Sequence, residues 1–150
     1  DAGCGTGKVG AALAARGFHD VVGVDLSAQS LDVAAASSNY RAVTEVDLGS
    51  LPTPLLDASF SALICVGVMT YFRDVESICR EFCRIIEPSG IIVLTQRTDL
   101  FESRNTQSAF DTLEQDGTWK IVEVTPERPY LPQHPEYEGI EVRYGVFERS

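Results

Sequence analysis

The sequence has few basic residues, few histidines and no long hydrophobic run. Its 12 Lys and Arg stand against 22 Asp and Glu, which gives a formal net charge of −10. A chain of this charge repels a phosphate backbone, so a nucleic-acid partner is disfavoured. No apolar segment approaches the length that a bilayer demands, so no membrane span is predicted either.

The cysteines lack the spacing of a zinc site or of a disulfide scaffold. There are four, Cys4, Cys65, Cys79 and Cys83, and only two histidines could assist them as metal ligands. Cys79 and Cys83 stand one helical turn apart, so a metal or redox pair is an alternative, but a pair of small core hydrophobes is favoured. No metal site is predicted, and reduced thiols favour a cytoplasmic location.

The hydrophobic content and the length favour a single domain over residues 1–150. Hydrophobic residues make up 44% of the sequence, which is enough for one core. A length of 150 residues is too short for two domains of ordinary size.

Short β-branched or apolar runs alternate with helical segments along the chain. We expect strands at 19–26, 41–48, 60–68 and 91–97, and helices at 8–17, 27–38, within 74–90 and at 108–117. Residues 119–124 and 141–149 alternate in the manner of half-exposed antiparallel strands, and four prolines between them, in 125–139, are expected to break any regular element. This order predicts an α/β fold with a Rossmann-like, doubly wound, mostly parallel sheet and a C-terminal antiparallel hairpin.

The chain opens on the glycine-rich stretch "DAGCGTGKVG", which leads into a predicted helix. A glycine loop of this kind follows the first strand of such a sheet, and only Asp1 and Ala2 of that strand could be present. We therefore expect the chain to be truncated at its N-terminus, with the first strand largely missing and the centre of the sheet open.

Two glycine patterns other than the one favoured below are open to this loop. A phosphate-binding P-loop would place Gly7 and Lys8 correctly, but Ala2 and Val9 break its pattern, and it is rejected. A dinucleotide fingerprint is satisfied by Gly5, Gly7 and Gly10, with an acid further along the chain for a ribose hydroxyl. An NAD(P)-dependent oxidoreductase therefore remains an alternative.

Asp1, Gly3, Gly5 and Gly7 also form an acid followed by glycines at alternate positions. In this the chain resembles the class I S-adenosylmethionine-dependent methyltransferases. The resemblance implies S-adenosyl-L-methionine as cofactor, S-adenosyl-L-homocysteine as product, and methyl transfer to an unidentified acceptor by direct in-line displacement. It implies that the loop, Cys4 included, contacts the cofactor through its backbone.

Further landmarks of that family follow in order along the chain. Asp25 in "VVGVDLS" matches the acid that binds the ribose hydroxyls, and Asp47 in "EVDLGSLP" matches the acid that contacts the adenine, although Asp47 could instead form a turn. The resemblance places Leu26 and Leu48 against the adenine ring, although both could instead be core leucines. It also places "CVGVMTYF", which begins with Cys65 and Val66, beneath the methionine part, and "EPSG" at the turn before the next strand.

Within the family, the wording of "DAGCGTG" and "GVDLS" looks most like the small methyltransferase-like proteins of the Williams–Beuren region type. The sequence says less about the acceptor side of the site, and no catalytic residue is predicted. We expect the acceptor pocket above the loop after the 60–68 strand, segment 95–105 and the proline-rich segment. A small-molecule acceptor is favoured, a protein acceptor is not excluded, and a non-catalytic cofactor-binding protein is the second alternative.

Overall fold

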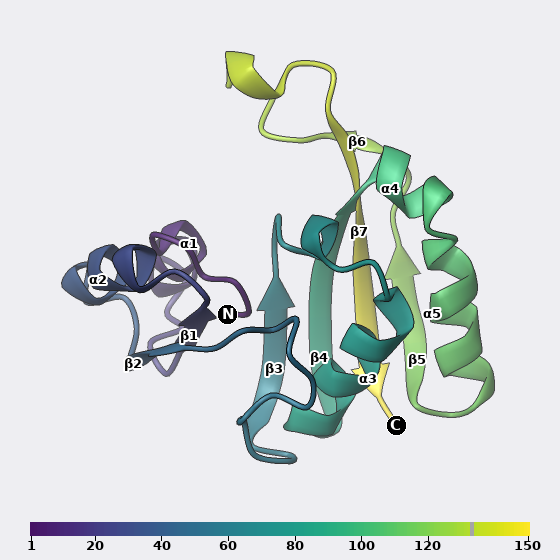
Figure 1. Ribbon diagram of the computed structural model, residues 1–150, viewed down its shortest axis with the longest axis horizontal. Helices are drawn as coiled ribbons and strands as arrows, with labels where there is room; N and C mark the ends of the chain where they lie inside the picture. The colour runs from purple at the N-terminus through teal and green to yellow at the C-terminus, as the bar shows by residue number, and fades with distance from the viewer. Residues whose placement is uncertain (133) are drawn as a thin grey trace.

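The computed structural model describes residues 1–132 and 134–150 and is an α/β structure with two sheets (Figure 1). The smaller sheet pairs β1 (Val22–Asp25) in parallel with β2 (Ala42–Glu45). The larger sheet has the order β3-β4-β7-β5, with the short strand β6 paired to β7. Its strands are β3 (Phe60–Cys65), β4 (Ile86–Arg97), β5 (Trp119–Val124), β6 (Arg128–Pro129) and β7 (Glu141–Arg149). The predicted fold class is confirmed, because β3 and β4 are parallel and β7 runs antiparallel to β4 and β5.

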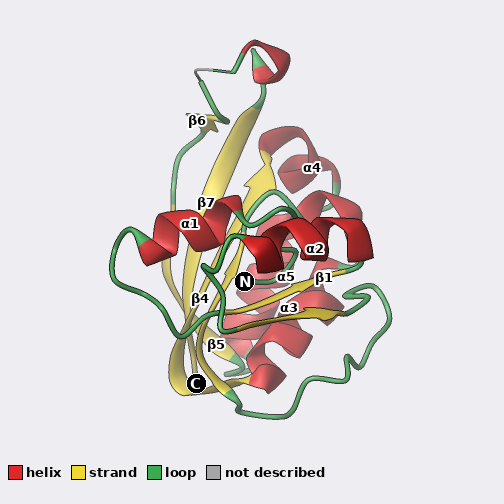
Figure 2. Ribbon diagram, turned by 90° about the vertical axis from the view of Figure 1, so that its left-hand side faces the viewer, coloured by secondary structure: helices red, strands yellow, loops and turns green. Residues whose placement is uncertain are grey.

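The helices divide between the two sheets. In Figure 1, α1 (Lys8–Ala14) and α2 (Ala28–Ala36) lie with β1 and β2, whereas α3 (Val75–Ile85) and α5 (Thr106–Gln115) cover one face of the larger sheet. Figure 2 shows α1 and α2 on the near side of the molecule, with the long strands β4 and β7 behind them. The remaining helical elements are η1 (Met69–Tyr71), α4 (Thr98–Ser103) and η2 (Pro135–Tyr137).

Ala2 lies where the two sheets meet. It forms a parallel bridge with Val24 of β1, and its N–H donates to the carbonyl of Ile64 in β3 at 2.8 Å. The carbonyl of Asp1 accepts from the Val24 N–H at 3.0 Å. Asp1 and Ala2 thus take the place of a strand between β1 and β3, while the N-terminal truncation itself stays a prediction.

The core of the larger sheet is aromatic beneath α5. The Trp119 ring stacks on Phe147 with centroids 3.9 Å apart, and Phe110 meets Phe147 edge-on at 4.8 Å. Trp119 donates from Nε1 to the Phe110 carbonyl at 3.1 Å, so its single polar group is satisfied inside the core. Cys79 and Cys83 belong to the same hydrophobic core as free thiols, which confirms their interpretation as core hydrophobes.

One turn differs from the sequence-based expectation. The helix within 74–90 ends at Ile85 and β4 begins at the next residue, so "EPSG" forms a bulge inside β4 and not a separate turn before it. Phe60 pairs with Ile86 and Ala62 pairs with Ile91, which pushes four residues out of the ladder. Ser89 there adopts a left-handed φ of 63°.

The proline-rich segment is more regular than expected. Pro129 lies in β6, where it pairs with Glu141 at the sheet edge, and Pro135 starts η2. The expectation that the prolines break every regular element is therefore wrong, because an edge strand and a first helical position both tolerate the missing N–H. Helix α4 had no counterpart among the expected elements, and α5 begins two residues before the expected start.

Candidate functional site

The glycine loop has the backbone that its composition requires. Gly3, Gly5 and Gly7 have φ angles of 77°, 51° and 90°, which side chains other than glycine rarely adopt. A Cβ added to Gly3 would lie 2.3 Å from Cγ2 of Val68, so the loop packs tightly against the segment that follows β3. At Gly5 a Cβ would meet no atom within 4 Å. The loop is therefore closed against the protein at Gly3 and open at Gly5.

Asp25, at the end of β1, is hydrogen-bonded to the glycine loop. Its Oδ2 accepts from the Gly5 N–H at 2.8 Å, and its Oδ1 accepts from the Ser27 N–H at 2.9 Å. Each carboxylate oxygen keeps a second acceptor site, because an ionised carboxylate can accept about four hydrogen bonds in all. The half-buried carboxylate thus fixes the loop and retains capacity for hydroxyl donors.

Tyr40 completes the support of the loop, and sequence reasoning missed it. Its hydroxyl donates to Oδ2 of Asp1 at 2.6 Å and accepts from the Gly10 N–H at 3.0 Å. A Cβ at Gly10 would lie 2.3 Å from the Tyr40 ring, so a glycine inside α1 was the available signal. Burial raises the pKa of Tyr40, which keeps the hydroxyl protonated as a donor. Oδ1 of Asp1 is buried without a hydrogen-bond partner among the described residues.

The residues expected around an adenine ring differ in exposure. Leu26 is 63% exposed beside Asp25, whereas Leu48 is buried in the hydrophobic core. Asp47 is exposed, and its Oδ1 accepts from the Gly49 N–H at 2.8 Å, which is the turn that the sequence allowed as an alternative. Leu26 and Asp47 are therefore open to solvent, whereas Leu48 is not, and the contact of all three with an adenine ring stays a prediction.

The cysteines of the site are not nucleophiles. Cys65 ends β3 fully buried, and this burial raises the pKa of its thiol to about 12. Cys4 is also buried, and burial followed by the Asp25 charge raises the pKa of its thiol. Both thiols stay protonated near neutral pH, so neither Cys4 nor Cys65 supplies a thiolate, and their contact with a cofactor stays a prediction.

The segment after β3 joins the loop to the larger sheet. Val66 is half-buried, and the Gly67 N–H donates to Oγ1 of Thr95 in β4 at 2.9 Å. Val68 contacts Gly3, as described above. The fold therefore brings 1–7, Asp25 and the 65–68 segment together where β1 and β3 end.

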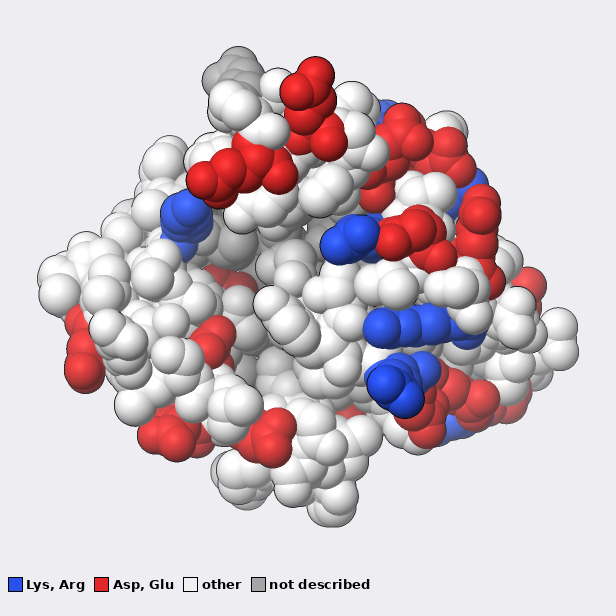
Figure 3. Space-filling view, turned by 45° about the horizontal axis from the view of Figure 1, so that its top comes forward, with Lys and Arg blue, Asp and Glu red and all other residues white. Residues whose placement is uncertain are grey.

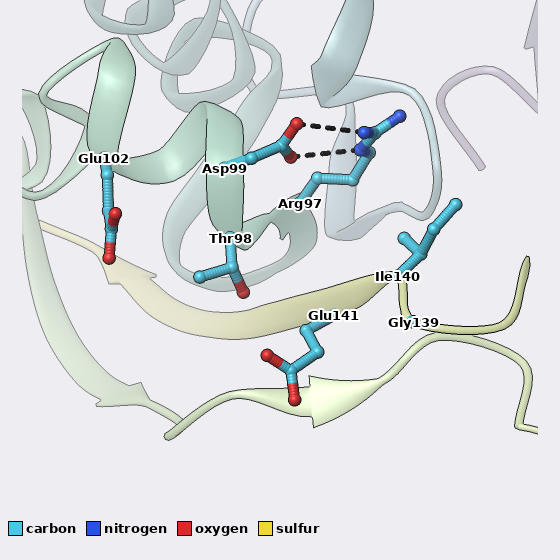
Figure 4. A pocket seen from close by; sticks show the side chains of 7 residues that line it. All are labelled: Arg97, Thr98, Asp99, Glu102, Gly139, Ile140 and Glu141. Atoms are coloured by element: carbon cyan, nitrogen blue, oxygen red, sulfur yellow. Dashed lines mark hydrogen bonds and ion pairs between the residues drawn. The ribbon is translucent and has the colours of Figure 1, made fainter.

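Figure 3 shows this end of the molecule hollowed between the α1 and α2 side and the α4 side, with mostly uncharged residues in the hollow. A separate cavity of about 360 Å³ lies between α4 and the start of β7 (Figure 4). It is lined by Arg97, Thr98, Asp99, Glu102, Gly139, Ile140 and Glu141. None of these was expected to bind the cofactor, but the first five belong to the 95–105 and proline-rich segments that were expected at the acceptor pocket. Arg97 pairs there with Asp99 at 2.9 Å and 3.1 Å, so its charge is already matched.

The described residues form neither a membrane-spanning helix nor a cluster of metal ligands. None of the helices there is long and apolar enough to cross a membrane. In the same part of the chain, no group of three His, Cys, Asp or Glu side chains is placed to hold a metal ion.

Comparison with known proteins gives one family. Residues 1–94 match the family model described as "Methyltransferase domain". Human methyltransferase-like protein 27 is 34% identical over 125 residues, which are 80% of this chain and 50% of that protein. A ubiquinone biosynthesis O-methyltransferase from Neisseria meningitidis is 28% identical over 96 residues, 61% of this chain and 40% of that protein. The chain thus spans about half or less of the length of these curated relatives.

Solved structures agree in fold. An S-adenosylmethionine-dependent methyltransferase from Mesorhizobium loti superposes with a TM-score of 0.75 at 18% identity, over 99% of this chain and 89% of that one. One from Methanosarcina mazei gives a TM-score of 0.76 at 15% identity, over 99% and 90% of the two chains. At these identities the likeness concerns the fold, whereas the family match covers the glycine loop, Asp25 and Asp47. The chain belongs to the class I S-adenosylmethionine-dependent methyltransferase family.

Proposed function

We propose that this chain binds S-adenosyl-L-methionine in the glycine loop and transfers its methyl group to an acceptor, releasing S-adenosyl-L-homocysteine. The observation that carries the proposal is the bond from the Gly5 N–H to the Asp25 carboxylate at 2.8 Å, which fixes the acid directly under an open glycine turn. A small-molecule acceptor and a cytoplasmic location belong to the same proposal. The four free cysteines support the location, because thiols persist in a reducing compartment.

The donors and acceptors present fit this cofactor. Asp25 has spare acceptor capacity for the two ribose hydroxyls, and the buried, unpartnered Oδ1 of Asp1 is an acceptor for a ligand ammonium group. Gly5 leaves room for a ligand against the backbone, and exposed Leu26 offers apolar surface to the adenine. The cofactor, when bound, supplies a methyl group that already carries a good leaving group.

The protein's own contribution is then position more than acid or base chemistry. Asp25 and Tyr40 hold the loop rigid, and Gly3 packs it on Val68, so the ligand meets a preformed surface. Placing a nucleophile in line with the methyl group lowers the barrier by removing orientational freedom before the reaction. Asp47 would reach the adenine edge through the carboxylate oxygen that its turn leaves free.

The alternatives are less well supported. An NAD(P)-dependent oxidoreductase shares the loop and the acid, but the methyltransferase family model matches across both. A non-catalytic S-adenosylmethionine-binding protein would share all the features above and differs only in turnover. The closer resemblance to the Williams–Beuren region type stays a prediction, as does the N-terminal truncation.

Calorimetric titration of the full-length protein tests the proposal. We expect S-adenosylhomocysteine and S-adenosylmethionine to bind more tightly than NAD, and Asp25→Ala to weaken their binding by about 1–3 kcal/mol, because the carboxylate holds both the ribose and the loop. Asp32→Ala, at an exposed acid on α2, is the matched control and should leave the affinity unchanged. Tighter binding of NAD would overturn the proposal.

A further inference from the structure

Aromatic side chains gather at the carboxyl end of β3, beside the loop segment just described. Tyr130 follows β6, and its hydroxyl would lie 2.9 Å from a Cβ built on Gly67, so it covers that glycine closely. Gly67 has a φ of 76° and stands two residues after the last residue of β3. The proline-rich segment thus returns over the sheet and places a tyrosine where the cofactor loop and β3 meet.

Three further tyrosines lie near enough to Tyr130 to influence its charge, so that four of the five in the chain belong to this group. The ring of Tyr137 packs edge-on against Tyr130 with centroids 5.3 Å apart. Tyr144 pairs with Thr95 across β4 and β7, and Thr95 in turn binds Gly67. Tyr71, in η1 just beyond the 65–68 segment, is 81% exposed. Burial, and then the proximity of the other three, raises the pKa of Tyr130, so its hydroxyl stays neutral.

The group lies against the proposed cofactor site and not apart from it. Gly67 lies under Tyr130, and its neighbour Val68 touches Gly3 of the glycine loop. Tyr130 therefore contacts one residue of this segment, and the next residue contacts the glycine loop. In the described part of the chain, no hydrogen bond to the Tyr130 hydroxyl is formed within the protein, which leaves it available to a ligand.

Three arginines near this group are already engaged within the protein. Arg97 is matched by Asp99, and Arg143 donates to Glu127 at 2.9 Å. Arg104 donates to the backbone carbonyls of Met69 and Phe72, holding η1 in place. Arg73 and Arg128 stay exposed two residues from Tyr71 and Tyr130, and between them the tyrosine rings and hydroxyls supply the recognition chemistry in a chain of net charge −10.

We propose that Tyr130 and Tyr71 form the acceptor side of the site and bind a planar aromatic ring that carries the accepting hydroxyl or amine. Aromatic rings attract one another in stacked or edge-on geometry beyond their apolar burial, and an exposed tyrosine offers both a face and a polar tip. Tyr137 packs edge-on against Tyr130 and supports its position. This inference rests on the proposed function, because an acceptor needs the cofactor beside it.

The test uses catechol as the aromatic probe and trans-1,2-cyclohexanediol as a probe with the same pair of hydroxyls but no ring face. Each is titrated into the full-length protein, alone and saturated with S-adenosylhomocysteine. We expect catechol to bind at least about fivefold more tightly than the diol. Tyr130→Leu should remove most of that preference, whereas Tyr130→Phe, which keeps the ring, should keep it. Phe18→Leu, a 60% exposed aromatic between α1 and β1, is the control.

The affinity for S-adenosylhomocysteine separates the two proposals. If it is unchanged in Tyr130→Leu while the catechol preference is lost, the acceptor role is supported. If catechol and the diol bind equally, or if Tyr130→Leu binds catechol as well as the unaltered protein does, the acceptor role is overturned and the cofactor proposal stands. Failure of the unaltered protein to bind S-adenosylhomocysteine overturns the cofactor proposal and, with it, this one.

Discussion

Glu81 is a buried carboxylate whose ionisation should govern the acid stability of the domain. It lies on α3 and is 6% exposed. Its Oε1 accepts from the Thr53 N–H at 2.8 Å, from the Thr53 hydroxyl at 2.6 Å and from Nη2 of Arg84 at 2.6 Å. Its Oε2 accepts from Nε of Arg84 at 2.9 Å. The carboxylate therefore fastens the segment before β3 to α3.

The magnitude follows from the pKa of this carboxyl. The hydrogen bonds from Arg84, and then those from Thr53, lower the pKa of Glu81 from 4.5 to about 2. A pKa lowered by folding gives stability that is complete well above pH 4.5 and is lost as the pH falls towards 2. The full shift corresponds to about 3 kcal/mol, and about 2 kcal/mol of it should be lost by pH 3.

Urea unfolding of the unaltered protein and of Glu81→Gln, at pH 7 and pH 3, measures this contribution. The glutamine keeps the size of the side chain but carries no charge, so Glu81→Gln should be the less stable protein at pH 7. Because the difference between the two proteins depends on the ionised carboxylate, it should shrink by about 2 kcal/mol at pH 3. Glu76→Gln, at a more exposed acid on the same helix, is the control. An equal difference at both pH values would refute the reasoning.

Two more substitutions test buried polar groups. Gln96 in β4 is 1% exposed, and neither its amide nitrogen nor its amide oxygen has a hydrogen-bond partner among the described residues. Gln96→Met should raise the free energy of unfolding by about 1–2 kcal/mol in urea titrations, and a loss of stability would show that the amide has a partner. Tyr40→Phe removes the hydrogen bonds to Asp1 and Gly10, so it should lower the free energy of unfolding by about 1–2 kcal/mol and weaken S-adenosylhomocysteine binding. Unchanged calorimetric affinity would mean that the loop does not need this support.

The parts of the fold that follow from local pattern were predictable from the sequence. The glycine-rich stretch predicted a loop that leads into a helix, and its three alternate glycines have a left-handed backbone there. Short β-branched runs predicted β1 and β3, and Gly117, with a φ of 76°, follows α5 as expected. The bulge in β4 was harder, because Ser89 takes a left-handed backbone there that its side chain disfavours and the surrounding ladder imposes.

The parts of the site that depend on distant contacts could not be predicted. Tyr40 reaches Asp1 across 39 residues of sequence, and no local period shows that pairing. The proline-rich segment was expected beside the loop after β3, but nothing in its pattern singled out Tyr130 as the residue that covers Gly67. The role of Asp25 could be predicted because this residue ends a predicted strand, and the direction of the strand fixes where its last side chain lies. Side chains fixed by tertiary packing, such as both tyrosines, need the folded structure.

The position of Ala2 gives ligand binding a second consequence. The α1 and α2 half touches the larger sheet through one alanine's backbone and the apolar packing around it. The loop that begins there bonds to β1 through Gly3 and Cys4 and packs on the segment after β3 at Val68. A ligand that contacts both Gly5 and Val66 would therefore connect the α1 and α2 half to the larger sheet. Any interaction that stabilises the contact between the halves would raise the affinity for the ligand. By linkage, ligand binding would stabilise that contact by the same free energy.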